Sequence, residues 1–278
     1  MKVETLAQQL LFSTVRLETV GPTGAGTATT FVFNYLKDDA AVPVLVTNKH
    51  VVERAETARF FFTASDGKEP VIGKAVGFTI EDAASQWHGH PRDEVDVAVM
   101  PLGPLITKIR ELKKQIFFRF VPSDWIPTEE QIEELDALEE VVFVGYPNGL
   151  LDTKNLTPIM RRGTTATPLA LDYNGEPVFL IDASVFPGSS GSPVFIHNVG
   201  SYSTMKGLVV GSRIIFLGLV GQVAYREDEG EIGFRSIPTA QVPFVKTREM
   251  IDLGVVYKAS TVVETVEDLI KARGLKQA

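Results

Sequence analysis

Three side chains in this sequence could together activate a hydroxyl group for attack on a carbonyl carbon. Ser190 lies in the segment FPGSSGSPV, residues 186–194, where Gly188 permits backbone conformations that other residues avoid. A serine hydroxyl is a weak nucleophile until a neighbouring base takes its proton. Taken alone, the segment fits either an exposed nucleophile on a tight turn or an ordinary flexible loop.

The base expected for Ser190 is His50, and Asp96 is expected to orient that histidine. His50 directly follows an apolar strand and is therefore held by a rigid element, although a lone histidine here also fits a core or surface position. Asp96 begins a second apolar strand, and a buried carboxylate is stabilised by a partner such as an imidazole N–H. The turn at Ser190 could also direct the amides of Gly188 and Ser190 at one point, as an oxyanion hole requires.

Short β-branched and aromatic segments must position these residues. One series of candidate strands lies within residues 14–101 and a second within residues 140–237. Such spacing predicts a sandwich or barrels rather than alternating strands and helices. Between the two series, residues 107–114 and 128–140 have helical, charged sequences, with Thr128 as an N-cap. A last helix is expected over residues 265–272, closed by Gly274.

Composition excludes several other classes of function. The 278 residues carry a formal charge of -8, which argues against nucleic acid as the main partner because phosphate binding needs a basic face. The absence of cysteine removes disulfides, thiolate metal sites and a cysteine nucleophile. No signal-peptide pattern is visible at the N-terminus, so a cytoplasmic location is expected.

One apolar stretch, residues 207–225, imitates a membrane span. Arg213 near its middle and the repeated glycines argue against a spanning helix. We interpret the stretch as two buried β-strands joined at a bend, and we expect no membrane association. His88 and His90 could suggest a metal, but two histidines without a third ligand in an obvious motif are better explained as a surface loop.

The three segments TNKHVV (47–52), DVAV (96–99) and PGSSGSP (187–193), in this order, resemble the catalytic motifs of trypsin-like serine peptidases. The similarity is greatest to the cysteine-free bacterial branch, such as the Deg-type proteases. The segments 145–149 and 182–183 match the family further, and residues 233–238 resemble its final strand.

The resemblance implies an all-β fold of two antiparallel β-barrels, chymotrypsin-like, with a helical connector and a short C-terminal helix. The first barrel would span about residues 14–105, the connector 106–139 and the second barrel 140–245, with 246–278 as a C-terminal extension. It also implies a serine endopeptidase acting on a protein or peptide substrate, with no metal or organic cofactor. His50 would be the general base, Asp96 its orienting partner and Ser190 the nucleophile.

The substrate contacts implied by the resemblance are less specific. By family spacing, Ser184 would lie at the base of the primary pocket, and Gln222, Val223 and Ala224 would pair with the substrate backbone. Because the base carries no acidic residue, a small or medium apolar side chain is expected there rather than arginine or lysine.

The sequence departs from the family at Ser189, where an aspartate is usual, and at Ser192, where a second glycine is common. Activation through a newly formed N-terminus is therefore not expected. A following PDZ module is not expected either, because only about 30 residues follow residue 245 and a domain usually needs more than about 50. Control by a homo-oligomer, an activating partner or loop ordering would fit a latent protease. The main alternative is a catalytically silent module that binds peptides on the same fold. An α/β-hydrolase esterase would need the order Ser, Asp, His and a G-x-S-x-G elbow. This sequence has the order His, Asp, Ser, and its segment GSSGS does not match that elbow.

Overall fold

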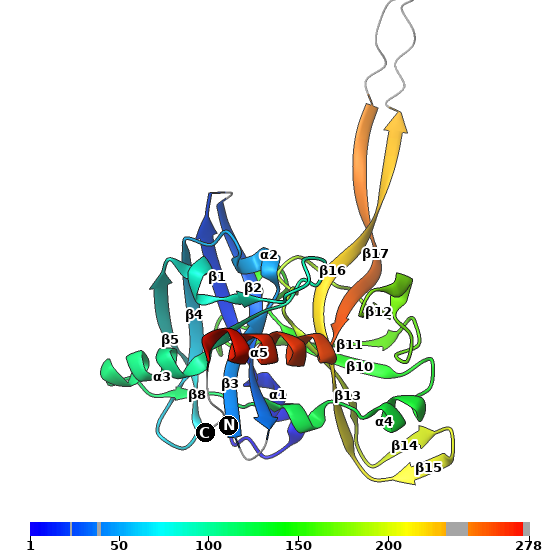
Figure 1. Ribbon diagram of the computed structural model, residues 1–278, viewed down its shortest axis with the longest axis horizontal. Coiled ribbons are helices and arrows are strands. Elements are labelled where there is room, and N and C mark those ends of the chain that lie inside the picture. The colour runs from blue at the N-terminus through cyan, green and yellow to red at the C-terminus, as the bar shows by residue number, and fades with distance from the viewer. Residues whose placement is uncertain (23, 38–39, 232–243, 275–278) are drawn as a thin grey trace, which may run out of the picture.

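The computed structural model describes residues 1–22, 24–37, 40–231 and 244–274; for residues 223–231 and 244–251 it describes the backbone. Its elements form two strand-rich halves that lie side by side (Figure 1). The predicted final strand at residues 233–238 lies outside the described residues. The all-β, chymotrypsin-like fold class predicted from the sequence is confirmed.

The N-terminal half is a nine-stranded sheet in the order β5-β4-β1-β2-β3-β7-β6, in which β8 pairs with β4 and β9 with β2. Its strands are β1 (Thr14–Gly21), β2 (Gly24–Lys37), β3 (Ala40–Thr47), β4 (Thr57–Ser65), β5 (Pro70–Glu81), β6 (His88–Gly89), β7 (Ala98–Pro101), β8 (Ile116–Phe117) and β9 (Val121–Pro122). Its helices are α1 (Leu6–Leu11), α2 (Lys49–Val52), the 3-10 turn η1 (Ala83–Gln86) and α3 (Leu102–Glu111). Two of these strands, β8 and β9, lie within the predicted connector.

The C-terminal half contains a closed barrel in the order β10-β11-β12-β17-β16-β13. Its strands are β10 (Glu140–Gly145), β11 (Ile159–Thr165), β12 (Val178–Asp182), β13 (Pro193–Asn198), β16 (Arg213–Glu231) and β17 (Phe244–Lys258). A separate hairpin joins β14 (Ser201–Thr204) to β15 (Gly207–Val210). The helical segments are η2 (Ser123–Trp125), α4 (Glu129–Glu133), η3 (Pro147–Gly149), η4 (Tyr173–Gly175) and α5 (Ala259–Arg273).

One hydrophobic cluster joins the two halves and fixes their relative position. Phe31 of β2 packs edge-on against Phe216 of β16, with ring centroids 5.4 Å apart, and Phe216 also contacts Phe195 of β13. All three side chains are fully buried. Burial of a phenylalanine contributes about 1.5–3 kcal/mol of hydrophobic free energy, so this shared core resists relative movement of the halves. Two further clusters fill the interior of each half separately.

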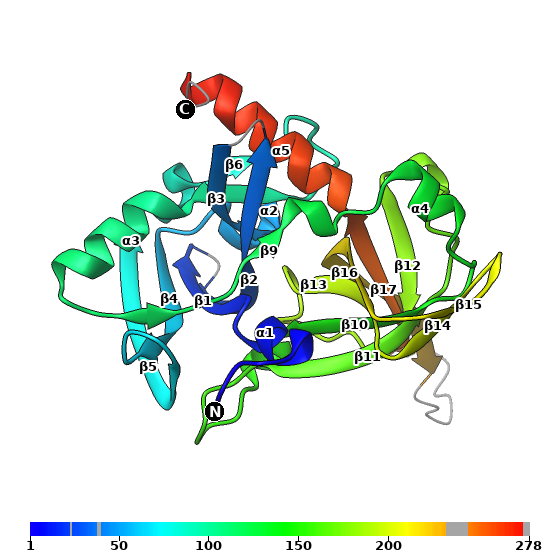
Figure 2. The same ribbon diagram turned by 90° about the horizontal axis from the view of Figure 1, so that it is seen from below.

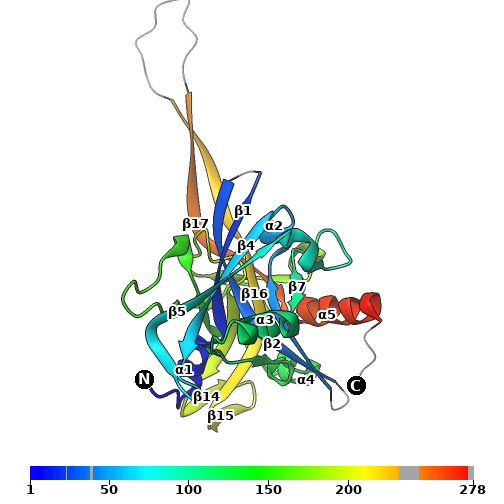
Figure 3. The same ribbon diagram turned by 90° about the vertical axis from the view of Figure 1, so that its left-hand side faces the viewer.

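The second barrel extends beyond the predicted boundary at residue 245. Strand β17 crosses that boundary and pairs with β12 from Leu253 to Tyr257, because the apolar run 253–257 completes the barrel wall. The backbones of β16 and β17 also continue past the barrel as a two-stranded ribbon that projects from the body (Figures 1 and 3). Barrel and ribbon thus share the same two strands.

Helix α5 starts earlier than the predicted residue 265 and ends as predicted, with Gly274 in a left-handed C-cap. Its first turns contain β-branched residues of low helix propensity, but Val262 and Val266 are fully buried and packing overrides that propensity. The helix lies across β6, β7 and β16 (Figure 2). Helix α4 begins after the predicted N-cap Thr128 and ends at Glu133, before the predicted residue 140. Glu139, beyond its end, is buried and pairs with Arg213 at 2.9 Å.

The apolar stretch 207–225 forms strand β15 and part of β16. The stretch does contain two strands, and the chain turns between them near Gly211, whose φ is 158°, before β16 begins at Arg213. Strand β15 is exposed rather than buried. Among the described residues, no helix combines the length and the apolar character that crossing a bilayer requires.

Candidate active site

His50 is held at the end of a buried strand and is oriented by both oxygens of one carboxylate. Strand β3 ends at Thr47, and the chain turns at Asn48 into the short helix α2. The His50 amide donates to Asp96 Oδ1 at 2.9 Å, and His50 Nδ1 lies 2.6 Å from Asp96 Oδ2. Because an ionised carboxylate only accepts, Nδ1 carries the proton and Nε2 remains able to accept one.

Asp96 lies in a loop that its neighbours anchor firmly. Val95 and Val97 on either side are fully buried, and the loop is closed by the His90 amide, which donates to the Val97 carbonyl at 2.8 Å. Asn48 Nδ2 donates to the Asp96 backbone carbonyl at 2.7 Å. The Asp96 side chain is 15% exposed and that of His50 is 49% exposed. The carboxylate is therefore largely shielded while the imidazole faces solvent.

The sequence suggested that His88 and His90 lie in a surface loop, but the structure places both against helix α5. His90 has only 1% of its side chain exposed and lies 3.0 Å from Glu264 of α5. His88 lies 2.8 Å from Asp268 of the same helix. The prediction failed because the covering helix is distant in the sequence. Both histidines attach α5 to the segment that leads to Asp96.

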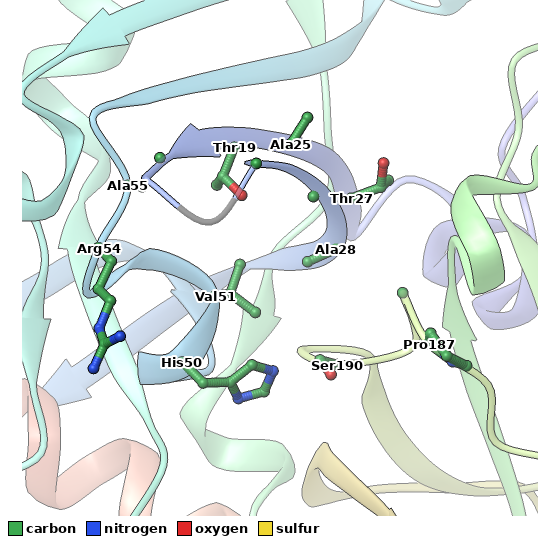
Figure 4. A pocket seen from close by; sticks show the side chains of 14 residues that line it. Thr19, Ala25, Thr27, Ala28, His50, Val51, Arg54, Ala55, Pro187 and Ser190 are labelled. Atoms are coloured by element: carbon green, nitrogen blue, oxygen red, sulfur yellow. The ribbon is translucent and has the colours of Figure 1, made fainter. Parts of the chain in front are cut away.

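Ser190 lies opposite His50 on the loop between β12 and β13. Both residues line a cleft of about 310 Å³ together with the β1–β2 hairpin. Figure 4 shows the His50 imidazole directed across this cleft toward Ser190. The Ser190 hydroxyl donates to the Gly221 carbonyl at 3.4 Å. At that distance the bond is weak, so a small rotation of the side chain can free the hydroxyl.

Glycine is required on both sides of Ser190. Gly188 and Gly191 have φ values of 84° and 83°, in the left-handed region. A Cβ atom on Gly188 would lie 2.7 Å from the Tyr146 carbonyl oxygen, and one on Gly191 would overlap the Thr29 carbonyl oxygen. The GSSGS composition therefore reflects a tightly packed turn rather than a flexible loop.

The backbone of this turn leaves two amides available. The amides of Ser189, Gly191 and Ser192 donate to the carbonyls of Phe186, Val220 and Ser189 at 2.9, 2.8 and 2.9 Å. Those of Gly188 and Ser190 donate to no other group in the described part of the chain.

The orientation of these two amides follows from the carbonyls in the same peptide groups. The Asn148 amide donates to the Pro187 carbonyl at 2.5 Å, and the Ser192 amide donates to the Ser189 carbonyl. In a trans peptide the N–H points opposite to the C=O. The N–H groups of Gly188 and Ser190 must therefore point away from these donors, and both residues line the cleft.

The predicted substrate-contacting residues are only partly brought together. Gln222 is exposed and lines a second cleft, of about 540 Å³, which His50 also lines. Ser184 is exposed but lines neither cleft. The backbones of Val223 and Ala224 belong to β16, and their side chains lie outside the described features.

Thr29 of β2 contacts the Ser190 turn and was not singled out by the sequence. It is fully buried, and its amide donates to the Ser190 carbonyl at 3.0 Å. Its hydroxyl donates to the Gly188 carbonyl at 3.2 Å and accepts from the Tyr146 amide at 3.0 Å. Burial raises the pKa of Tyr146 to about 12, which keeps this neighbour neutral. A single threonine in a strand gives no sequence signal for this role.

Tyr257 borders the second cleft beside Asp96. Burial, and then the negative charge of Asp96, raise the pKa of its phenol. The phenol is therefore neutral at neutral pH, and it donates to the Glu94 carbonyl at 3.4 Å.

Comparison with known proteins identifies the family of the chain. The family model described as "Trypsin-like peptidase domain" matches residues 28–200, a range that includes His50, Asp96 and Ser190. No curated protein matches the chain.

Several solved structures are similar to the chain at low sequence identity. Rv3671c from M. tuberculosis H37Rv, an inactive serine-to-alanine mutant, is 17% identical; the match covers 98% of this chain and 91% of that one, with a TM-score of 0.45. The HtrA-type protease AlgW with a tripeptide is 14% identical, with coverages of 96% and 62% and a TM-score of 0.49. This chain thus spans less than two-thirds of AlgW. A scabies mite inactivated protease paralogue is 15% identical, with coverages of 95% and 96% and a TM-score of 0.48.

The family match covers more than half of the chain and includes strands of both halves. The chain therefore belongs to the trypsin-like peptidase family and is a hydrolase of the serine-protease type.

Proposed function

We propose that the chain is a serine endopeptidase that cleaves peptide bonds through Ser190, His50 and Asp96. The observation that carries this proposal is the two-point contact between His50 and Asp96, at 2.9 and 2.6 Å. It fixes the tautomer in which Nε2 can accept a proton, and the imidazole is directed toward Ser190.

The proposed reaction proceeds in two stages. Ser190 Oγ attacks the scissile carbonyl carbon while His50 Nε2 takes the hydroxyl proton, and the amides of Gly188 and Ser190 bind the resulting oxyanion. The tetrahedral intermediate collapses, the C–N bond breaks and His50 gives its proton to the leaving amine. Water then attacks the acyl carbonyl carbon while His50 takes its proton. The bond between this carbon and Ser190 Oγ breaks, His50 returns the proton to Ser190 Oγ, and the carboxylic acid leaves. Asp96 stabilises the imidazolium in both stages.

For substrate binding, we propose that the peptide backbone pairs with the strand at Gln222, Val223 and Ala224. Gln222 lines the cleft beside His50, which supports this placement. Ser184 remains the proposed base of the primary pocket, with a preference for small or medium apolar side chains. A peptide library scanned at that position tests the preference.

We also propose that the resting site is partly latent, so that Ser190 reacts with a small probe at rest but faster once a trigger acts. The Ser190 hydroxyl contacts the Gly221 carbonyl, and a bound substrate, a second copy of the chain or an activating partner would favour its release toward His50. Labelling of Ser190 measured over a wide range of protein concentration tests the role of a second copy. A rate constant independent of concentration would contradict it.

The proposed nucleophile is tested by labelling the purified protein with a fluorophosphonate probe. We expect the wild type to be labelled at Ser190, Ser190→Ala to remain unlabelled and His50→Ala to react at least about 10³-fold more slowly. Ser203→Ala, on the exposed strand β14, is the control and should react like the wild type. If the folded wild type is not labelled but binds peptides, the chain is instead a catalytically silent peptide-binding module.

A further inference from the structure

One arginine of strand β11 forms hydrogen bonds with the turn that carries Ser190. Arg161 lies in β11, and its Nη2 donates to Ser189 Oγ at 2.6 Å. Its Nη1 donates to the Ser184 carbonyl. Ser184 and Ser189 are the two ends of the segment that immediately precedes the nucleophile. One guanidinium group therefore closes this segment across its ends.

Two aromatic rings fix the guanidinium in this place. Its central carbon lies 4.5 Å from the ring centroid of Phe143 in β10 and 5.7 Å from that of Phe186 in the same segment. A guanidinium over an aromatic face is attracted by the negative side of the ring quadrupole. The Phe186 amide also points at Ser189 Oγ, at 3.4 Å. Ser189 itself is fully buried.

The partners of Arg161 are all uncharged. It is half-buried, and burial lowers the pKa of its guanidinium. In the part of the chain that the structure describes, no carboxylate forms an ion pair with it. Hydrogen bonds to a carbonyl and a hydroxyl, together with the two rings, must offset the cost of partial burial. The planar guanidinium directs two N–H donors at the Ser184 carbonyl and Ser189 Oγ at once. A lysine ammonium has no such pair of fixed donors.

We propose that Arg161 is a positioning residue that keeps the amides of Gly188 and Ser190 directed into the cleft. This proposal rests on the proposed function. Ser189 lies between these two amides, so anchoring its side chain fixes the peptide groups on both sides. Without the guanidinium, the buried Ser189 hydroxyl loses its strongest partner and the segment loses the link between its ends. The turn could then rotate its peptide groups while the barrel remains folded.

The test compares Arg161→Met with Arg162→Met. Arg162 is the next residue of β11, but it is exposed and pairs with Glu140 at 2.7 Å. The probe is a fluorophosphonate, with its maximal inactivation rate constant and its affinity measured separately. We expect Arg161→Met to lower that rate constant about 100-fold with little change in affinity. Arg162→Met should react like the wild type.

Two further variants keep the test informative if Arg161→Met folds poorly. Ser189→Ala removes one of the two acceptors and should lower the same rate constant about tenfold. Arg161→Lys should fall between Arg161→Met and the wild type, because it can reach one acceptor. Combined with Arg161→Met, Ser189→Ala should add no further loss, since both remove one interaction.

Equal rate constants for Arg161→Met and the wild type, with only a lower melting temperature, would overturn the positioning role. Absence of labelling in the wild type would instead contradict the proposed function. In that case hydrogen exchange still decides about Arg161: the amides of the 184–190 segment should exchange at least about tenfold faster in Arg161→Met. Unchanged exchange would overturn the proposal independently of catalysis.

Discussion

The two halves of the molecule hold their parts of the site in different ways. The N-terminal half fixes His50 and Asp96 through direct side-chain contacts at the ends of strands, next to fully buried valines. The C-terminal half places Ser190 on a turn whose useful groups are backbone amides. The geometry of that turn depends on glycines and on residues from other segments, among them Thr29 and Arg161.

This difference separates two kinds of vulnerability. A change of residue type at His50 or Asp96 removes a chemical group and leaves the surrounding backbone in place. A change around Ser190 leaves the chemical groups in place and alters their direction. Three substitutions, each with a matched control, test whether the two halves differ in this manner, and a fourth lies outside the site.

The largest effect after loss of the nucleophile is expected for Asp96→Asn. The amide can donate toward His50 Nδ1 and favours the wrong tautomer, so kcat should fall by about 10⁴-fold. The melting temperature should change little because the side chain keeps its size. Peptide hydrolysis and calorimetry measure the two quantities. Asp124→Asn, an exposed aspartate in η2, is the control, and an equal loss there would contradict the assignment.

Gly188→Ala should lower activity about 10²-fold by displacing one oxyanion amide. The added Cβ would lie 2.7 Å from the Tyr146 carbonyl oxygen, at a φ of 84°. Gly175→Ala is the matched control, because its φ is 78° and its Cβ would meet no atom within 4 Å. The control should lose about 1 kcal/mol of stability through backbone strain and keep its activity. Equal activity losses in both variants would show that strain alone explains the effect.

Thr29→Val and Thr30→Val compare the two halves through adjacent, fully buried threonines of β2. The Thr29 hydroxyl contacts Gly188 and Tyr146 of the C-terminal half, whereas the Thr30 hydroxyl donates to Val46 within its own half, at 2.8 Å. Each loss should cost about 1–3 kcal/mol of unfolding free energy. Only Thr29→Val should also lower activity, by about tenfold. Denaturant titration and peptide hydrolysis distinguish the two, and equal activities would remove Thr29 from the site.

The smallest effect is expected for Glu267→Gln in α5, far from the cleft. Glu267 accepts from Tyr35 at 2.6 Å and from Lys37 at 2.9 Å, and these bonds hold its pKa below the ordinary 4.5. A lowered carboxyl pKa stabilises the fold above the ordinary value, and the contribution is lost as the pH falls through the lowered value. Glu267→Gln should cost about 1 kcal/mol or less at pH 7, and the difference should shrink at acidic pH. Denaturant titrations at several pH values check this trend.

The two parts of the site also differ in how well the sequence predicts them. The sequence singles out His50, Asp96 and Ser190 as candidates because their residue types and neighbouring strands lie in short local motifs. Arg161 and Thr29 were not, since their importance comes from contacts with a turn that is distant in the sequence. The position of His90 under α5 was missed for the same reason.

Strand spacing and turn residues predicted an all-β class, and the family resemblance implied the chymotrypsin-like arrangement, but element boundaries were less predictable. Strand β17 passes the expected boundary at residue 245 because its partner is β12, which the local pattern cannot reveal. Helix α5 begins at Ala259, where β-branched residues disfavour a helix locally but fill the shared core. Both differences arise where long-range packing decides the local structure.

The central claim is that Ser190 forms the acyl-enzyme, and trapping that intermediate tests it most directly. The protein is mixed with a small-residue peptide nitrophenyl ester, quenched in acid within milliseconds to seconds and digested for mass spectrometry. The account predicts an acyl group on Ser190 in the wild type and none in Ser190→Ala. An acyl group on another residue, or unchanged ester hydrolysis by Ser190→Ala, would contradict it.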